Sequence, residues 1–257
     1  MAKLKASLIH LALSSVVVGS IFLIIFFAWY PYPYFEIRGA GDIVLILIGV
    51  DLVLGPLLTF IVYKPKKKTL VFDLSVIVII QLVALVYGVG AIYEERPYFM
   101  VYAVDRFTLL AGKDVDFSEI ADRSLREKPG IGPHMVLAKM PEDPRERQQL
   151  MTEVVFENKP DLDRRPKYWV PYRENLEIVF ARTKTLQELR EKRGSVAGLV
   201  DKIVASHGGN IDDLAFAPMI GKNGDFAIVL ERNTGKMVDA IAVDPWLDDD
   251  LPLPHDE

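Results

Sequence analysis

The sequence contains no cysteine, which excludes disulfide bonds, zinc–thiolate sites and thiol nucleophiles. Histidine is also scarce, and the four present are spaced too irregularly for a metal-binding motif: His10, His134, His207 and His255. The net charge is −5, and no basic stripe occurs outside one short loop. We therefore expect no metal, no cofactor and no nucleic acid partner.

Catalytic motifs are missing as well. The stretch Ser206–Gly209 superficially resembles an oxyanion loop, but no Gly-x-Ser-x-Gly turn accompanies it, so we interpret it as the end of a helix. Asp161 and Asp163 lack the glycine and the distal glutamate of a calcium loop. With no catalytic residue to name, we expect the protein not to be an enzyme.

Three long apolar runs fill the first third of the chain, at Leu8–Tyr30, Ile43–Tyr63 and Leu74–Tyr93. Each is close to the roughly 20 residues that cross a bilayer as a helix, and each ends in aromatic residues suited to the interface. The first run is too long for a signal peptide, and its end is a poor cleavage site. We predict a three-helix transmembrane domain over residues 1–93.

Lysines determine the expected orientation of these helices. Lys3 and Lys5 precede the first run, and four more lysines lie within the loop 64–68 between the second and third runs. The loop between the first and second runs carries little positive charge. Because lysine and arginine accumulate on the cytoplasmic side, we expect a multi-pass inner-membrane protein with a cytoplasmic N-terminus and a periplasmic C-terminal domain.

Polar residues interrupt the second and third runs near their middles. Asp51, Gly55 and Thr59 follow one another at helical spacing and form a small, polar stripe, and Gln81 lies at a similar depth in the third run. These four residues are our candidate partner-binding site. Three interpretations remain open: a hydrogen bond between Asp51 and Gln81 that only holds the bundle together, an Asp51 that receives a polar group from a partner's membrane helix, and a proton or ion pathway.

The region 94–244 has the mixed pattern of an α+β domain with an antiparallel sheet. We predict strands and helices over these ranges: a strand 98–110, a helix 117–127, a strand 134–139, a helix 144–156 capped by Asp143, and a helix 186–206 interrupted near Gly194. Residues 158–171 are expected to form a loop. The strongest β signal is the ending, where strands 214–218, 226–231 and 237–243 are separated by two glycine-containing turns. Residues 245–257 are expected to form an acidic, solvated tail.

Several phrases resemble the type IV pilin accessory proteins of Gram-negative bacteria (the TfpX/TfpZ type). The phrases that carry the resemblance are these: Trp29–Tyr34, Gly49–Thr59, Phe72–Ser75 and Tyr93–Pro97. The run Val-Asp-Leu-Val-Leu-Gly-Pro-Leu-Leu-Thr at 50–59 is the most specific of them. The resemblance covers essentially the full length and implies no catalytic residue.

This resemblance implies a role in supporting pilin before or during the assembly of pili used in twitching motility and adhesion. Such a pilin waits in the bilayer as one apolar helix, with its globular head outside. Our hypothesis is a pilin chaperone in which the second and third spans hold the pilin helix, the outer domain contacts the head, and Asp51 pairs with the pilin's amino group. The alternatives are a membrane receptor with a periplasmic ligand-binding domain and, with less support, a pilin-modifying enzyme.

Overall fold

The chain, described here from a computed structural model that covers residues 1–127 and 130–246, divides into two compact units. The units are Met1–Arg96 and Pro97–Glu257. The division falls a few residues after the expected boundary at 93, because the last apolar helix continues to Glu94. Residues 247–257 of the expected acidic tail lie outside the described residues.

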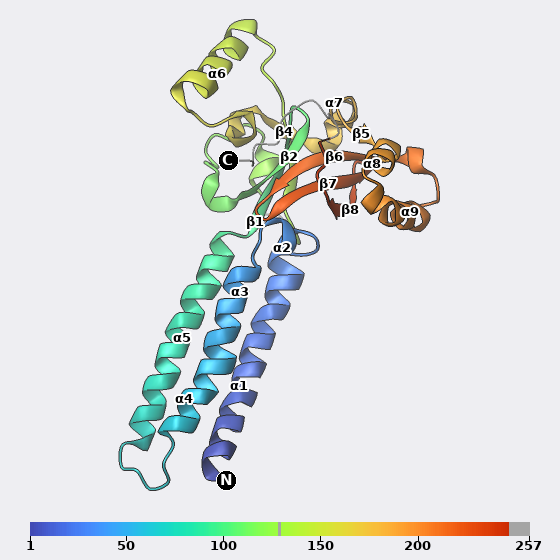
Figure 1. Cartoon of the computed structure of the whole chain (residues 1–257). Coiled ribbons are helices and arrows are strands. Elements are labelled where there is room, and N and C mark those ends of the chain that lie inside the picture. The colour runs from blue at the N-terminus through green and yellow to red at the C-terminus, as the bar shows by residue number, and fades with distance from the viewer. Residues whose placement is uncertain (128–129, 247–257) are drawn as a thin grey trace. The chain divides into compact units, whose positions relative to one another are not determined.

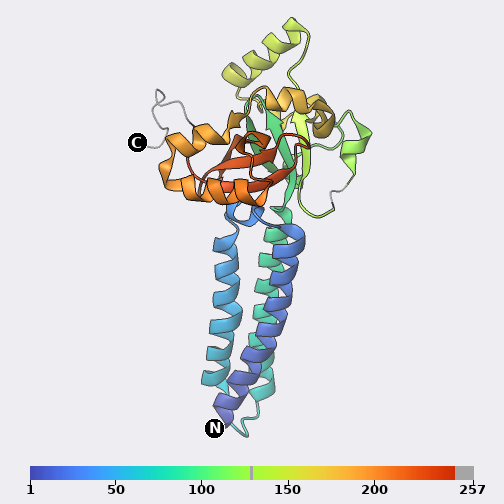
Figure 2. The same cartoon turned by 90° about the vertical axis from the view of Figure 1, so that its right-hand side faces the viewer.

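Three helical segments in the described chain are long and apolar enough to cross a membrane, as the sequence predicted. They lie side by side in Figures 1 and 2. The first joins α1 (Ala2–Ile24) to a π-helical segment, and the third is α5 (Leu70–Glu94). The second consists of three parts in sequence: α3 (Gly41–Ile48), the π-helical segment Gly49–Leu54 and α4 (Gly55–Val62). A short helix, α2 (Tyr34–Ile37), connects the first two.

One end of this helical unit is tied together by the segment between the first two spans. The Tyr30 hydroxyl donates to the Ile92 carbonyl at 2.8 Å, and the Trp29 ring lies 4.9 Å from the Tyr93 ring. Arg38 forms a 2.9 Å ion pair with Glu95. These contacts fasten the end of the first span and the following segment to the end of α5.

The second unit is built on an eight-stranded sheet with the order β4-β3-β1-β2-β6-β7-β8, and β5 also pairs with β6. The strands have these bounds: β1 Pro97–Ala103, β2 Arg106–Ala111, β3 His134–Ala138, β4 Trp169–Pro171, β5 Lys184–Thr185, β6 Leu214–Gly221, β7 Gly224–Glu231 and β8 Met237–Ala242. The predicted meander at the end is confirmed as the antiparallel run β6-β7-β8.

The predicted antiparallel sheet is confirmed in part: the sheet is mixed, because β1 pairs with β3 in parallel and β2 pairs with β6 in parallel. The predicted single strand 98–110 is a hairpin, in which Val104 adopts a positive φ at the turn between β1 and β2. After β2 the chain crosses over before it returns as β3, which makes the pairing of β3 with β1 parallel.

Helices cover the sheet on both halves. Leu150 from α6 (Pro144–Glu157) packs with side chains of β1 and β3, among them Phe99 and Val136. Apolar residues of α8 (Leu186–Lys192) and α9 (Ala197–Ser206) pack on β6, β7 and β8. A 3-10 turn at Gly194–Val196 separates these two helices, as predicted. The remaining helix, α7 (Leu176–Phe180), is short.

Two local predictions for this unit are wrong. Residues 117–127 form turns and one 3-10 segment, Arg123–Arg126, in place of a helix, because the Asp116 and Asp122 side chains accept hydrogen bonds from local backbone N–H groups. The expected loop 158–171 contains two 3-10 turns and ends in β4. The helix α6 begins as predicted, with the Asp143 carboxylate accepting from the Arg145 N–H.

Candidate functional site

The buried polar side chains of the described residues, tyrosine and tryptophan apart, are those of Asp51, Thr59 and Gln81. All three lie in the helical unit, and each is less than a tenth exposed. Asp51 comes from the π-helical segment, Thr59 from α4 and Gln81 from α5. Gly55, also buried, lies between Asp51 and Thr59 on the second span. The structure thus brings Gln81 to Asp51 and Gly55, whereas Thr59 lies about two turns from Asp51 along the second span.

Gln81 crosses from α5 to the second span. Its Nε2 group lies 3.3 Å from Asp51 Oδ1, 3.4 Å from the Val50 carbonyl and 3.5 Å from the Asp51 carbonyl. A Cβ atom at Gly55 would lie 2.1 Å from Gln81 Nε2, which is far inside van der Waals contact. Glycine at this position is therefore what allows Gln81 to reach the backbone and side chain of the second span.

The backbone around Asp51 departs from the α-helical hydrogen-bond pattern. Pro56 has no N–H, so it cannot bond to the carbonyl four residues before it, and the π-helical segment Gly49–Leu54 lies directly upstream. π-Helical turns are rare and occur often at functional sites. The irregular segment carries Asp51 and supplies the two carbonyls that accept from Gln81.

The first span contributes a histidine that the sequence analysis did not include in the site. His10 Nδ1 lies 2.6 Å from Thr59 Oγ1, and the Ser7 hydroxyl donates to the Pro56 carbonyl at 2.8 Å. A histidine within an apolar run is itself a signal for a polar partner across the helix interface. The partner could not be read from the sequence, because the rotation of α1 against α4 is set by packing.

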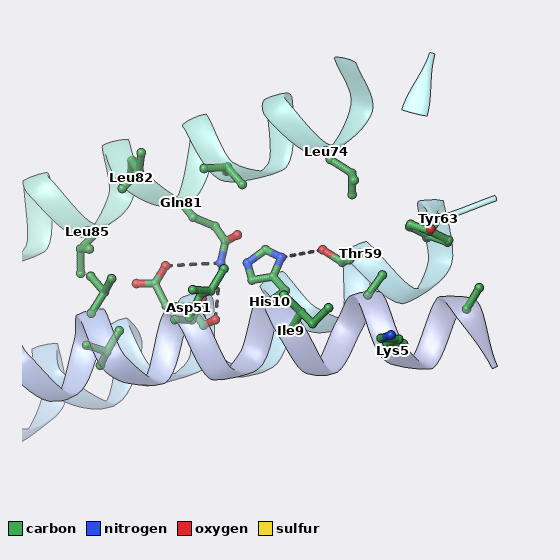
Figure 3. Close-up of a pocket in the computed structure, with 17 residues that line it drawn as sticks. Lys5, Ile9, His10, Asp51, Thr59, Tyr63, Leu74, Gln81, Leu82 and Leu85 are labelled. Atoms are coloured by element: carbon green, nitrogen blue, oxygen red, sulfur yellow. Dashed lines mark hydrogen bonds between the residues drawn. The ribbon is translucent and has the colours of Figure 1, made fainter. Parts of the chain in front are cut away.

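A groove of about 670 Å³ opens among the three spans, and Asp51, Gln81, His10 and Thr59 line it (Figure 3). Its walls are α1 and α5, and the second span supplies Asp51, Thr59 and Tyr63. Most of the remaining lining is aliphatic, including Leu13, Val78 and Leu82. The hypothesis named the second and third spans as the binding surface, and this groove is also lined by the first span.

Two acceptor atoms in this cluster have no hydrogen-bond partner. They are Asp51 Oδ2 and Gln81 Oε1, both buried. Buried polar atoms in folded proteins are nearly always paired, since an unpaired one costs about 1–3 kcal/mol. Figure 3 shows the Asp51 and Gln81 side chains between α1 and α5, on the side where the groove lies. The cluster is therefore able to accept hydrogen bonds from a further polar group.

Sequence comparisons show what the whole chain is similar to. A family model described as "Fimbrial assembly protein FimB" matches residues 1–39. The "Fimbrial assembly protein, serogroup I" of Dichelobacter nodosus is 30% identical over 249 residues, which cover 94% of this chain and 95% of that protein. The serogroup E1 protein of the same organism is also 30% identical, over 248 residues and equal shares of the two chains.

The chain belongs to the fimbrial assembly protein family. A third member, from serogroups C1 and C2, is 40% identical over 118 residues, which are 45% of this chain and 90% of that protein. No solved structure matches the chain. The two full-length similarities cover both units of this family member, and the region matched by the family model includes His10.

Other polar clusters of this family member have local structural explanations. His207 follows α9, and the N–H groups of His207 and Gly209 both bond to the Val204 carbonyl, which supports the interpretation of 206–209 as a helix end. Among the described residues, no group of three or more histidine, aspartate or glutamate side chains is arranged to hold a metal ion.

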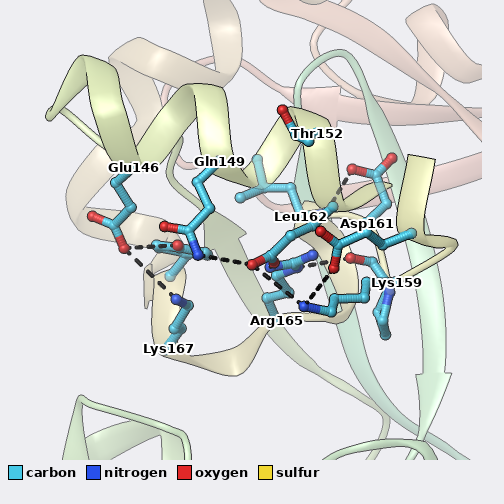
Figure 4. A network of polar contacts seen from close by, with 12 residues as sticks. Glu146, Gln149, Thr152, Lys159, Asp161, Leu162, Arg165 and Lys167 are labelled. Atoms are coloured by element: carbon cyan, nitrogen blue, oxygen red, sulfur yellow. Dashed lines mark hydrogen bonds and ion pairs between the residues drawn. The ribbon is translucent and has the colours of Figure 1, made fainter. Parts of the chain in front are cut away.

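A larger polar network fastens α6 in the second unit (Figure 4). Glu153 pairs with Arg165 at 2.5 Å and with Lys159 at 3.5 Å, and Glu146 accepts from the Tyr168 hydroxyl at 2.8 Å. Hydrogen bonds from Arg165 and Gln149 lower the pKa of Glu153 from 4.5 to about 2. Because these contacts join α6 to the segment that leads into β4, we assign the network to holding the helix in place.

Proposed function

We propose that this protein supports the assembly of type IV fimbriae by binding the unassembled pilin subunit and stabilising it in the inner membrane. The role is that of a chaperone and includes no catalytic step. Membership of the fimbrial assembly family supports the general role, and the phrases shared with the TfpX/TfpZ type support the finer assignment. In this proposal the protein acts before or during pilus assembly, upstream of adhesion and twitching motility.

The expected membrane topology fits such a client. The helix α1 begins beside Lys3 and Lys5, and the loop after α4 carries four more lysines, one of which, Lys67, pairs with Asp73 at 2.6 Å. The positive-inside rule then assigns this end to the cytoplasm and residues from Pro97 onward to the periplasm. A pilin has the same orientation, with its head outside, so each unit of this protein would share a compartment with one part of the client.

The groove is the observation that carries the proposal. Helices in a bilayer associate through close packing and through hydrogen bonds between polar side chains, because lipid offers no hydrophobic driving force between them. The groove offers both: aliphatic walls on α1 and α5, and a floor that contains Asp51 and Thr59. An apolar pilin helix with a polar group has the chemistry to lie there, while the outer domain contacts the pilin head.

The test is a crosslinking pull-down of the tagged, full-length protein from membranes, together with the pilin level in a deletion strain. We expect the major pilin to be the dominant crosslinked partner and to be depleted in the deletion strain. An eluate without pilin, with the pilin level unchanged, would overturn the proposal. A ligand-dependent thermal shift would then favour the receptor alternative, and an altered pilin mass in the deletion strain would favour a modifying enzyme.

A further inference from the structure

The depth of the polar cluster in the groove restricts what can bind there. Asp51 lies ten residues after Gly41 and eleven before Val62, at the middle of the second span. At about 1.5 Å per residue, either end of the helix is roughly 15 Å away. The terminus of a helix that crosses the bilayer lies at an interface and does not reach this depth. A group that contacts Asp51 therefore comes from a side chain in the middle of the bound helix.

The unpaired atoms define the chemistry of that side chain. Gln81 Oε1 can only accept a hydrogen bond, and so can Asp51 Oδ2 in the ionised carboxylate; the residues that carry them are 7% and 4% exposed. Neither can be satisfied by lipid tails, which offer no donors. The Gln81 Nε2 group is already engaged, since it contacts Asp51 and Val50. The missing element is thus a hydrogen-bond donor.

We propose that the groove receives a single transmembrane helix that carries a hydroxyl or amide side chain at mid-bilayer, and that Asp51 and Gln81 accept its hydrogen bond. This inference rests on the proposed function, in which the helix is that of the pilin, and it assigns Asp51 a partner other than the pilin's amino group. Thr59 lies about two turns from Asp51 along the second span, and its hydrogen bond with His10 joins α4 to α1.

The absence of cysteine makes a direct test practical, because any introduced cysteine is the only one in the chain. Val78 lines the groove one turn from Gln81, whereas Val83 is 66% exposed and lies outside the lining. Val78→Cys in the full-length protein should form disulfides with single cysteines placed in the middle of the pilin helix. The matched control Val83→Cys should form few, and equal yields at the two positions would overturn the groove as the site.

The acceptor is tested by Asp51→Asn in the Val78→Cys background. Asparagine keeps the oxygen that binds Gln81 Nε2 and replaces the unpaired acceptor by a donor, so we expect the disulfide yield to fall roughly three- to twentyfold. Asp42→Asn, in the first turn of α3, is the control and should leave the yield unchanged. Protein abundance, measured alongside, separates lost binding from lost folding.

A double-mutant cycle identifies the donor. Each hydroxyl or amide side chain in the middle of the pilin helix is replaced by an apolar residue, and one replacement should reduce the yield as much as Asp51→Asn does. Combining that replacement with Asp51→Asn should give no further loss. If Asp51→Asn leaves the yield high while pilin still co-purifies, this inference fails and the proposed function stands. If pilin neither co-purifies nor crosslinks, both fail.

Discussion

Polar side chains are distributed differently in the two units of this protein. In the helical unit, Asp51, Thr59 and Gln81 are buried among apolar residues, and two of their oxygen atoms have no partner. In the second unit, from Pro97 onward, the large buried side chains are aromatic or aliphatic, and charged groups such as Glu153 and Arg165 pair near the surface.

The comparison separates two uses of polarity. In water, surface ion pairs contribute little to stability, and an apolar core supplies most of the folding free energy. In a bilayer, a buried polar group is expensive and is typically retained for function. Under the proposed function, stability comes mainly from the apolar core of the second unit and pilin recognition from Asp51 and Gln81, and the following substitutions test that division.

The largest loss of stability is expected from a substitution in the apolar core of the second unit. Trp169 is 1% exposed, and its ring lies 4.8 Å from that of Phe99. Trp169→Ala should lower the free energy of unfolding by about 3–5 kcal/mol, since it leaves a cavity in a packed core. Circular dichroism during denaturation of the full-length protein in detergent measures this. Phe156→Ala, at a residue that is 81% exposed, should stay within about 0.5 kcal/mol.

The next effect concerns the close approach of Gln81 to the second span. Gly55→Ala places a Cβ atom where Gln81 Nε2 lies, so Gln81 must move or the helices must separate. We expect a destabilisation of about 1–3 kcal/mol, measured by thermal unfolding in detergent. At Gly90 an added Cβ atom meets nothing within 4 Å, and Gly90→Ala should be neutral or slightly stabilising. Equal behaviour of the two variants would contradict the close packing described here.

A smaller effect is expected when the glutamine itself is replaced. Gln81→Leu removes the hydrogen bond to Asp51 and should cost about 0.6 kcal/mol, the mean for interhelical hydrogen bonds in membranes, and at most about 1.7 kcal/mol. The same substitution in the second unit, Gln149→Leu, removes an exposed hydrogen bond to Glu153 and should cost less than about 0.5 kcal/mol. If Gln149→Leu is the less stable of the two variants, the contrast between the units is wrong.

The smallest expected effect is a dependence of the stability of the second unit on pH. The pKa of Glu153 falls from 4.5 to about 2 in the folded protein, so its ionised form stabilises the fold above pH 4.5. This contribution should be lost as the pH falls from 4.5 towards 2. Melting temperatures of the native protein and Glu153→Gln should differ at neutral pH and converge over that window. Glu119→Gln, at an exposed position, should show no such convergence.

Local patterns in the sequence were sufficient for much of this fold. Three apolar runs predicted three long helices, because the length and composition of a span are local properties. The turns at Gly221–Gly224 and Asn233–Lys236 predicted the β6-β7-β8 meander for the same reason. The helix interruption near Gly194 also came from the local pattern.

Contacts between distant residues were not predictable in this way. Nothing local to β1 or β3 specifies that they pair in parallel, since that depends on the path of the chain between them. The groove depends on the rotation of α1, which brings His10 to Thr59 across 49 positions of sequence. The candidate site was therefore predicted from the second and third spans alone, and the contribution of the first span came only from the structure.

The sheet of the second unit has a narrow junction between its two halves, which we call the seam. The half that contains β1 and β2 meets the half that contains β6 and β7 through one residue pair, Phe107 and Met219, and each half has its own apolar cluster. A sheet joined so narrowly has two cooperative units of opening. We expect amide hydrogens at the seam to exchange with deuterium sooner than those within either half, and a pulling force applied across the sheet to part it there first.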